Sequence, residues 1–179
     1  MPLLSFCYFQ DQQWDKSIEG FKKLANVDDS LGQNSMYLLG TAYLKVNDKN
    51  GAKNAFMLCA SKSINLEQKE ISLFNYGKLL VELKEYSLAV NVLDKFIENY
   101  PQSTYFPESK SLWITALAYN NNYKQALEAY QLMENPSLEL LKIYPAILYG
   151  LSCNHINDGE VEKAYTLLNQ LRNAPYNGN

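Results

Sequence analysis

The sequence is poor in the residues that most enzymes use for catalysis. His155 is the only histidine among 179 residues, so neither a histidine metal cluster nor a histidine relay can form. The three cysteines, Cys7, Cys59 and Cys153, show no CxxC or other metal-ligand spacing, and they are interpreted as small apolar side chains on helices. Cys153 and His155 are two residues apart and would point to different sides of a helix, which disfavours a nucleophile–base pair.

Motifs for nucleotide, zinc or calcium binding are also missing. The chain contains no GxGxxG, GxxxxGK[ST], HExxH or EF-hand pattern. Carboxylate pairs such as Glu67/Glu70 and Glu160/Glu162 fall on expected polar helix faces or first turns, where the helix dipole stabilises them. These absences predict a protein that is not an enzyme, with no catalytic residues, no metal and no cofactor.

Long apolar runs and an excess of basic charge are absent as well. No apolar run approaches the ~18–20 residues that a membrane span needs. The 16 Lys and Arg against 19 Asp and Glu give a net charge of −3, which disfavours nucleic acid as a partner because proteins that bind it are usually markedly basic. The first six residues, MPLLSF, lack the basic start and the apolar length of a signal peptide, and they do not identify a compartment.

What the chain does contain is a weak internal repeat. A small residue recurs at intervals of 35, 37, 37 and 38 residues, at Ser17, Ala52, Ala89, Ala126 and Ala164. A large apolar residue follows each of them four positions later, at Phe21, Phe56, Leu93, Tyr130 and Leu168. A period of this length is typical of stacked helix pairs, which present an extended surface to partners and seldom enclose a reaction centre.

Helical spacing within the repeats agrees with this interpretation. Ala52, Phe56 and Cys59 stand at i, i+4 and i+7, one stripe of an amphipathic helix. Gly40 and Gly77 occupy the same place in two neighbouring repeats, although a glycine inside a helix costs about 1 kcal/mol relative to alanine. We therefore expect close contact between helices at these two glycines.

The last repeat can be drawn in two ways. Its first helix either begins at Ser137 and kinks at Pro145, or begins afresh at Pro145. Its second helix carries Tyr165 and Leu167 on the side where a further unit would dock, and no polar capping helix follows in the sequence. This predicts either further repeats beyond Asn179 or self-association through the C-terminal repeat.

The recurring positions resemble the tetratricopeptide repeat (TPR). The consensus places are filled by Met36, Leu39-Gly40, Tyr43, Ala52, Phe56 and Cys59 in one repeat, and by Leu73, Tyr76-Gly77, Leu80, Ala89, Leu93, Phe96 and Pro101 in the next. The resemblance implies an all-α fold, a right-handed α-solenoid of about five helix-turn-helix units forming a single array over residues 1–179. The expected units are approximately 1–30, 31–66, 67–103, 104–136 and 137–174, and residues 175–179 are expected to form a frayed tail.

In this family the first helix of each unit lines the concave surface of the array. The resemblance therefore assigns partner binding to residues of these first helices, chiefly Tyr37, Thr41, Phe74, Lys78, Tyr119 and Tyr149. The groove so drawn is aromatic and polar but nearly uncharged, which suits an extended or helical peptide with apolar anchors. The alternative is that these aromatic residues pack on one another and leave no groove.

The segment between the third and fourth repeats carries a narrower likeness. Its Tyr-Pro-x-Ser-x-Tyr-x-x-Glu pattern, residues 100–108, is similar to junctions in bacterial envelope TPR proteins such as the outer-membrane assembly lipoprotein BamD and the cell-division coordinator CpoB. Physically it indicates a helix stop at Tyr100-Pro101, an N-cap at Ser103 and Pro107 in a new first turn. This likeness implies a periplasmic or cell-envelope location, with a cytoplasmic one as the alternative.

The sequence thus predicts a non-catalytic protein–protein interaction scaffold, part of a longer bacterial protein, that binds a protein or peptide segment along an aromatic concave groove. The alternative is a structural spacer or self-assembly module that acts through its end repeats. Neither nucleic acid nor a membrane span is expected among its partners.

Overall fold

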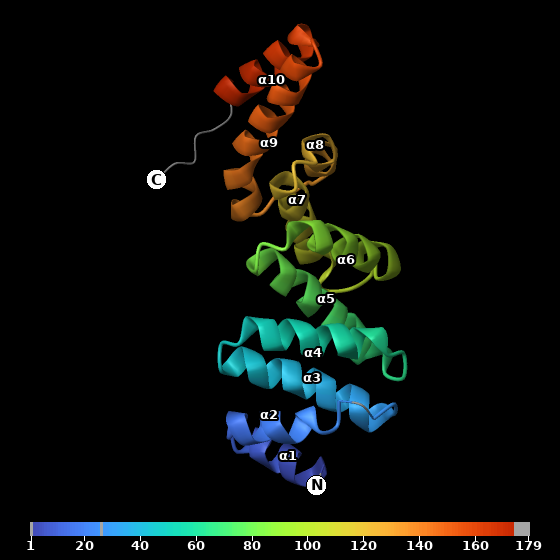
Figure 1. Cartoon of the computed structure of the whole chain (residues 1–179). Helices are drawn as coiled ribbons and strands as arrows, with labels where there is room; N and C mark the ends of the chain where they lie inside the picture. The colour runs from blue at the N-terminus through green and yellow to red at the C-terminus, as the bar shows by residue number, and fades with distance from the viewer. Residues whose placement is uncertain (1, 26, 174–179) are drawn as a thin grey trace.

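The computed structural model describes residues 2–25 and 27–173. Over these ranges the chain forms ten α-helices and no strand, arranged as successive helix pairs (Figure 1). The pairs are α1 (Pro2–Gln10) with α2 (Trp14–Lys22), α3 (Ser30–Lys45) with α4 (Lys49–Ser61), α5 (Leu66–Glu82) with α6 (Tyr86–Asn99), α7 (Phe106–Tyr119) with α8 (Tyr123–Gln131), and α9 (Leu138–Asn157) with α10 (Val161–Asn173). The all-α solenoid expected from the sequence is confirmed. Helices α3 and α5 begin one residue before the unit boundaries drawn from the sequence, and the tail 175–179 lies outside the described residues.

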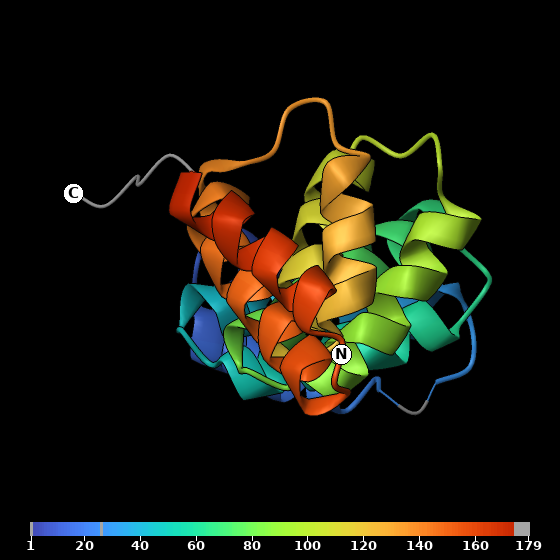
Figure 2. The same ribbon diagram turned by 90° about the horizontal axis from the view of Figure 1, so that it is seen from above.

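The helix pairs stack in chain order, with α1 at one end and α10 at the other (Figure 1). Each helix packs against the next one along the chain, both within a pair and between pairs. Seen along the stack, successive pairs are turned relative to one another, so the array twists (Figure 2). Such an array has no single centre, and each pair depends for its burial on its immediate neighbours.

The same turn joins the two helices of every pair. The residue two positions before each second helix has a positive φ between 58° and 76°, at Gln12, Asn47, Lys84, Asn121 and Gly159. The backbone N–H of the following residue donates to a carbonyl five residues earlier at 2.8–2.9 Å, for example Asp48 to Tyr43 and Glu85 to Leu80. This left-handed closure satisfies carbonyls at the end of the first helix and reverses the chain. The repeat is therefore a repeat of backbone geometry as well as of sequence.

Helix pairs pack closely at the two glycines singled out in the sequence. A Cβ atom on Gly40 would lie 2.8 Å from the Phe56 ring, and one on Gly77 would lie 2.6 Å from Leu93 Cδ2. Phe56 and Leu93 are the large apolar residues that follow the recurring alanines, and both are buried. The expectation of close helix contact is confirmed, because any larger residue would push the two helices of the pair apart.

The recurring positions are buried or half-buried throughout the array except at its last helix. Ser17 and the four recurring alanines are all buried. Leu168, expected in the core, is 37% exposed, whereas its neighbour Leu167 is only 8% exposed and joins the core between α7 and α10. The prediction that Leu167 faces an open end is therefore wrong, and the reason is that α10 turns Ala164, Leu167 and Leu171 toward α9.

The starts of two helices settle or correct what the sequence predicted. Helix α9 runs through Pro145 as one helix, and Ser137 caps it by accepting a hydrogen bond from Leu140 N–H at 3.3 Å, so the helix does not begin afresh at Pro145. Ser103 is not the N-cap of α7. Its Oγ accepts from Tyr105 N–H at 3.1 Å within the turn before the helix, and α7 starts at Phe106 with Pro107 in its first turn, as expected.

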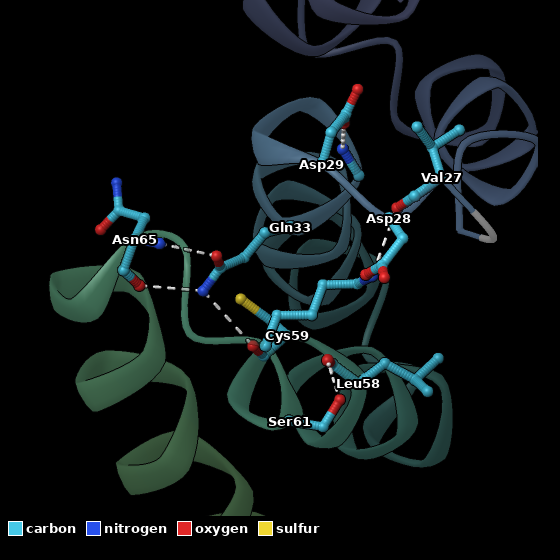
Figure 3. Close-up of polar contacts among 10 residues, drawn as sticks. Val27, Asp28, Asp29, Gln33, Leu58, Cys59, Ser61 and Asn65 are labelled. Carbon is cyan, nitrogen blue, oxygen red and sulfur yellow. Dashed lines mark hydrogen bonds and ion pairs between the residues drawn. The ribbon is translucent and has the colours of Figure 1, made fainter.

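A buried polar junction fixes the third helix pair to the second (Figure 3). The Gln33 side chain is fully buried; its amide NH₂ donates to Asn65 O at 2.9 Å, and its carbonyl oxygen accepts from Asn65 N–H at 2.8 Å. Asn65 in turn caps α5 by accepting from Gln68 N–H at 3.0 Å. Lys62, from the same loop, reaches back to the Asp28 carboxylate at 2.7 Å. One buried amide therefore positions the start of α5 relative to α3.

Candidate functional site

The first helices from α3 to α9 form one continuous wall. Helix α3 contacts α5, α5 contacts α7, and α7 contacts α9. Within the described residues, the second helices α4, α6, α8 and α10 make no comparable contacts with one another. The stack is therefore tighter on the side of the first helices, and that side is the inner wall on which the sequence placed its candidate residues.

The part of this wall between α3 and α5 is closed by aromatic packing. The Phe74 ring is only 3% exposed and is stacked on Tyr105 with ring centroids 4.4 Å apart. Tyr37 is half-buried with its ring edge against Phe56, and burial raises the pKa of its hydroxyl. The prediction that Phe74 presents its ring to a partner is wrong, because Tyr105, in the turn before α7, covers it.

The polar candidates of the same region are engaged within the chain. Thr41 Oγ1 donates to the Tyr37 carbonyl at 3.0 Å, as a helical threonine commonly does. Lys78 Nζ pairs with Glu108 Oε1 at 2.8 Å, with both side chains partly exposed, and it lies 5.8 Å from the centre of the Phe74 ring. Lys78 therefore ties α5 to the start of α7 at the border of the closed region.

The part of the wall between α7 and α9 is open. Tyr119 at the end of α7 and Tyr149 in α9 are 57% and 59% exposed. Both line a hollow of about 520 Å³, with Tyr123, Ile143 and Gly150 among its other walls. The structure thus brings together two of the six predicted residues, and they come from neighbouring first helices.

A second hollow lies farther along the same pair of helices. It has a volume of about 540 Å³ and is lined by Pro107, Glu108, Ser111, Leu112 and Thr115 of α7, together with Met133, Asn135, Ser137 and Glu139. We call the two hollows and the exposed Tyr119 and Tyr149 the α7–α9 groove. Its lining is largely apolar and includes hydroxyl and carboxylate side chains, an arrangement that suits apolar anchors of a bound segment.

Tyrosine contacts hold the walls of the groove in place. Tyr119 is stacked on Tyr86 of the preceding pair, with ring centroids 4.8 Å apart. Tyr123 packs its ring directly on Gly150, where a Cβ atom would lie 2.4 Å from it. A hydrogen bond with Cys153 raises the pKa of the Tyr149 hydroxyl. The groove thus offers aromatic rings together with hydroxyl and carboxylate groups.

Several groove residues were not singled out in the sequence. Met133, Asn135 and Ser137 come from the connection between α8 and α9, residues 132–137. Tyr86, from a second helix, supports Tyr119 from the side. The connection itself was the available signal, because connecting segments run over the surface of a protein.

The described residues show no group of three or more His, Cys, Asp or Glu side chains that could hold a metal ion. Among the described helices, none combines the length and the apolar character needed to cross a membrane.

Comparison with known families agrees with this geometry. Residues 33–61 and 72–103 each match a family model described as tetratricopeptide repeat. The chain carries tetratricopeptide repeats. The two TPR segments that match correspond to the pairs α3–α4 and α5–α6, on which the sequence resemblance was strongest. No curated protein sequence matches the chain.

Solved structures of TPR proteins share the fold along nearly the whole chain. A structure of nearly identical TPR-like repeats of a kinesin light chain from Podosopora anserina is 15% identical, with a TM-score of 0.51, over 97% of this chain and 92% of that one. MamA RS-1, as the ArsTM double mutant, is 16% identical with a TM-score of 0.56 over 96% and 90%. MamA AMB-1 is 14% identical with a TM-score of 0.53 over 97% and 96%. At this level of identity the likeness shows a shared fold.

Proposed function

We propose that this protein is a non-catalytic scaffold that binds a peptide segment of a partner protein in the α7–α9 groove. TPR arrays are typically protein-interaction modules, which supports a protein partner. The observation that carries the proposal is the pair of exposed tyrosines, Tyr119 and Tyr149, beside a hollow of about 520 Å³ on the inner wall. Exposed tyrosines are favoured at binding surfaces because they bury a large area at small conformational cost.

The occupant is a segment with two apolar anchors. The two hollows lie along the same pair of helices, so one extended or helical segment can reach both. Glu139 stands beside the hollow near the start of α9, whereas Glu108, near the start of α7, is already paired with Lys78. A basic residue next to the anchor at that end is therefore preferred over an acidic one.

The test is a selection of random displayed peptides on the wild-type protein, followed by affinity measurements with variants. We expect the selected peptides to contain spaced apolar residues, and Tyr119→Ala with Tyr149→Ala to weaken their binding at least about thirtyfold, the size of a hot-spot loss. The matched control is Tyr165→Ala, which truncates an equally exposed tyrosine of α10 outside the groove and should leave peptide binding unchanged. An equal loss of peptide affinity in the groove variant and in the control, or no loss of affinity in either, would refute the groove as the binding surface.

A cell-envelope location in a bacterium stays part of this proposal. Its support is the Tyr100–Glu108 junction, in which the helix stop and Pro107 in the first turn of α7 form as expected. Fractionation of cells that make the full-length gene product would test it, and recovery only from the cytoplasm would contradict it.

A further inference from the structure

The outer face of α10 is open at positions that are covered in the other pairs. In the first four pairs, the residue four positions after the recurring small residue packs in a cluster that includes the next first helix. Phe21, for example, shares a buried cluster with Leu39 and Ala42 of α3. At the corresponding position of the last pair, Leu168 is 37% exposed, and Tyr165 on the same face is 64% exposed.

The same relation holds in the middle and later pairs. Phe56 lies in a cluster with Tyr76 and Leu79 of α5, and Tyr130 packs against one that includes residues of α9. With Val161, which is also exposed, Tyr165 and Leu168 form one stripe at i, i+4 and i+7 along α10. This stripe is the half of a pair-to-pair junction that a following first helix would cover.

The other half of that junction is open at the opposite end of the stack. By repeat position, Leu4 and Cys7 of α1 correspond to Leu39 and Ala42 of α3, which are buried against the preceding pair. Leu4 is 53% exposed and Cys7 is exposed as well. Leu4 also lines a hollow of about 400 Å³ between α1 and α2.

We propose that copies of this chain associate end to end, with α1 of one copy packing on the Val161–Tyr165–Leu168 stripe of the next. This contact continues the junction that the chain already makes between its own pairs. Apolar or aromatic residues stand at the corresponding positions of α2, α6 and α8, whereas α4 carries Lys49 and Lys53 at the first two of them. The two faces lie at opposite ends of the stack, so one molecule can use both at once (Figure 1). The contact is head-to-tail, and it extends into a chain of molecules unless the rotation between copies closes a ring.

The association is a second surface, separate from the α7–α9 groove. Tyr165 and Leu168 are exposed in the single chain, so replacing them should not disturb folding. The contact is mainly apolar, and it should therefore persist at high salt, which screens exposed charges. These two features make the interface testable in the protein as it stands.

The experiment is sedimentation of the purified 179-residue chain between about 10 µM and about 1 mM, a range that covers weak association. We expect the average mass to rise with concentration. Tyr165→Glu with Leu168→Glu in one variant, and Leu4→Glu in another, should each weaken association at least about tenfold. Leu132→Glu is the matched control, since Leu132 is an exposed leucine at the end of α8, away from both end faces, and its variant should associate like the wild type.

Mixing the two variants tests the head-to-tail geometry. The α10 variant keeps an intact α1 face and the α1 variant keeps an intact α10 face, so the mixture should form dimers and nothing larger. A wild-type chain that stays monomeric at every concentration would overturn the proposal. So would a Leu4→Glu variant that dimerises as tightly as the wild-type chain associates, because this would show a contact that does not use the α1 face. Helical circular dichroism of each variant, unchanged from wild type, excludes unfolding as the cause of lost association.

Discussion

The inner wall of the array differs between its two halves. Between α3 and α5 the candidate side chains are engaged inside the chain, with Phe74 stacked under Tyr105 and Tyr37 against Phe56. Between α7 and α9 the tyrosines on the same wall are exposed beside two hollows. The first helices therefore bury their aromatic side chains in one unit and expose them in another. The connection before α7 places Tyr105 over Phe74, whereas the equally long connection before α9 supplies Met133, Asn135 and Ser137 to the lining of a hollow.

The largest expected effect is the difference in the free energy of unfolding between Phe74→Ala and Tyr149→Ala. Removing the buried Phe74 ring should lower the free energy of unfolding by about 3–5 kcal/mol, since it leaves a cavity between Phe96 and Tyr105. Removing the exposed Tyr149 ring should change it by no more than about 0.5 kcal/mol. Urea unfolding followed by helical circular dichroism measures both. Similar losses in the two variants would show that the halves of the wall do not differ.

A second effect concerns the buried hydrogen bonds between Gln33 and Asn65, which join α3 to the start of α5. Gln33→Ala leaves the Asn65 N–H and carbonyl without their partner, which should cost about 1–3 kcal/mol. Hydrogen exchange should also speed up at the start of α5. Gln125→Ala, at an exposed position of α8, is the matched control and should leave both quantities unchanged. Normal exchange in the Gln33 variant would mean that the junction does not hold α5 in place.

A smaller effect on stability is expected for the ion pair between Lys78 of α5 and Glu108 of α7. Lys78→Met removes the ion pair with Glu108, but both side chains are partly exposed, so the loss should not exceed about 0.5 kcal/mol. The loss should shrink further as salt is added. Lys124→Met on exposed α8 provides the control in urea unfolding at low and high salt. A loss above about 1 kcal/mol would assign the pair a structural role that its exposure does not suggest.

The smallest effect is a pH dependence at the open end of the array. Hydrogen bonds from Lys163 and His155 hold the pKa of the Glu160 carboxyl below its usual value. The stabilisation is therefore present above the ordinary glutamate pKa and is lost as the pH falls through the lowered one. Glu160→Gln should reduce the difference in thermal midpoint between about pH 6 and about pH 3. An unchanged difference would show that the carboxylate does not contribute.

Much of the fold could be predicted from spacing alone. The recurring alanines indicated the helix pairs, and Gly40 and Gly77 correctly indicated close approach, because a missing Cβ atom matters only where another helix lies against it. The shared left-handed turn was not foreseen, since Gln12, Asn47, Lys84 and Asn121 have no residue type common to all and the geometry is set by the helices on either side.

The exposure of the candidate aromatic residues could be predicted only in part. Tyr119 and Tyr149 were chosen from repeat position, whereas the same rule failed for Phe74, because the covering residue Tyr105 belongs to a connection that has no fixed place in the repeat. At the open end, the sequence placed Leu167 on the exposed face, whereas the structure exposes its neighbour Leu168. A narrow helical stripe does not distinguish the side facing its own pair from the side facing the next.

The most direct test of the difference between the halves is a hydrogen-exchange footprint of a peptide selected on the wild-type protein. Bound peptide should slow exchange in α7 and α9, over residues 106–119 and 138–157, and leave α3 and α5 unchanged. Protection confined to α3 and α5, with α7 and α9 exchanging as in the free protein, would contradict the assignment of binding to the α7–α9 groove.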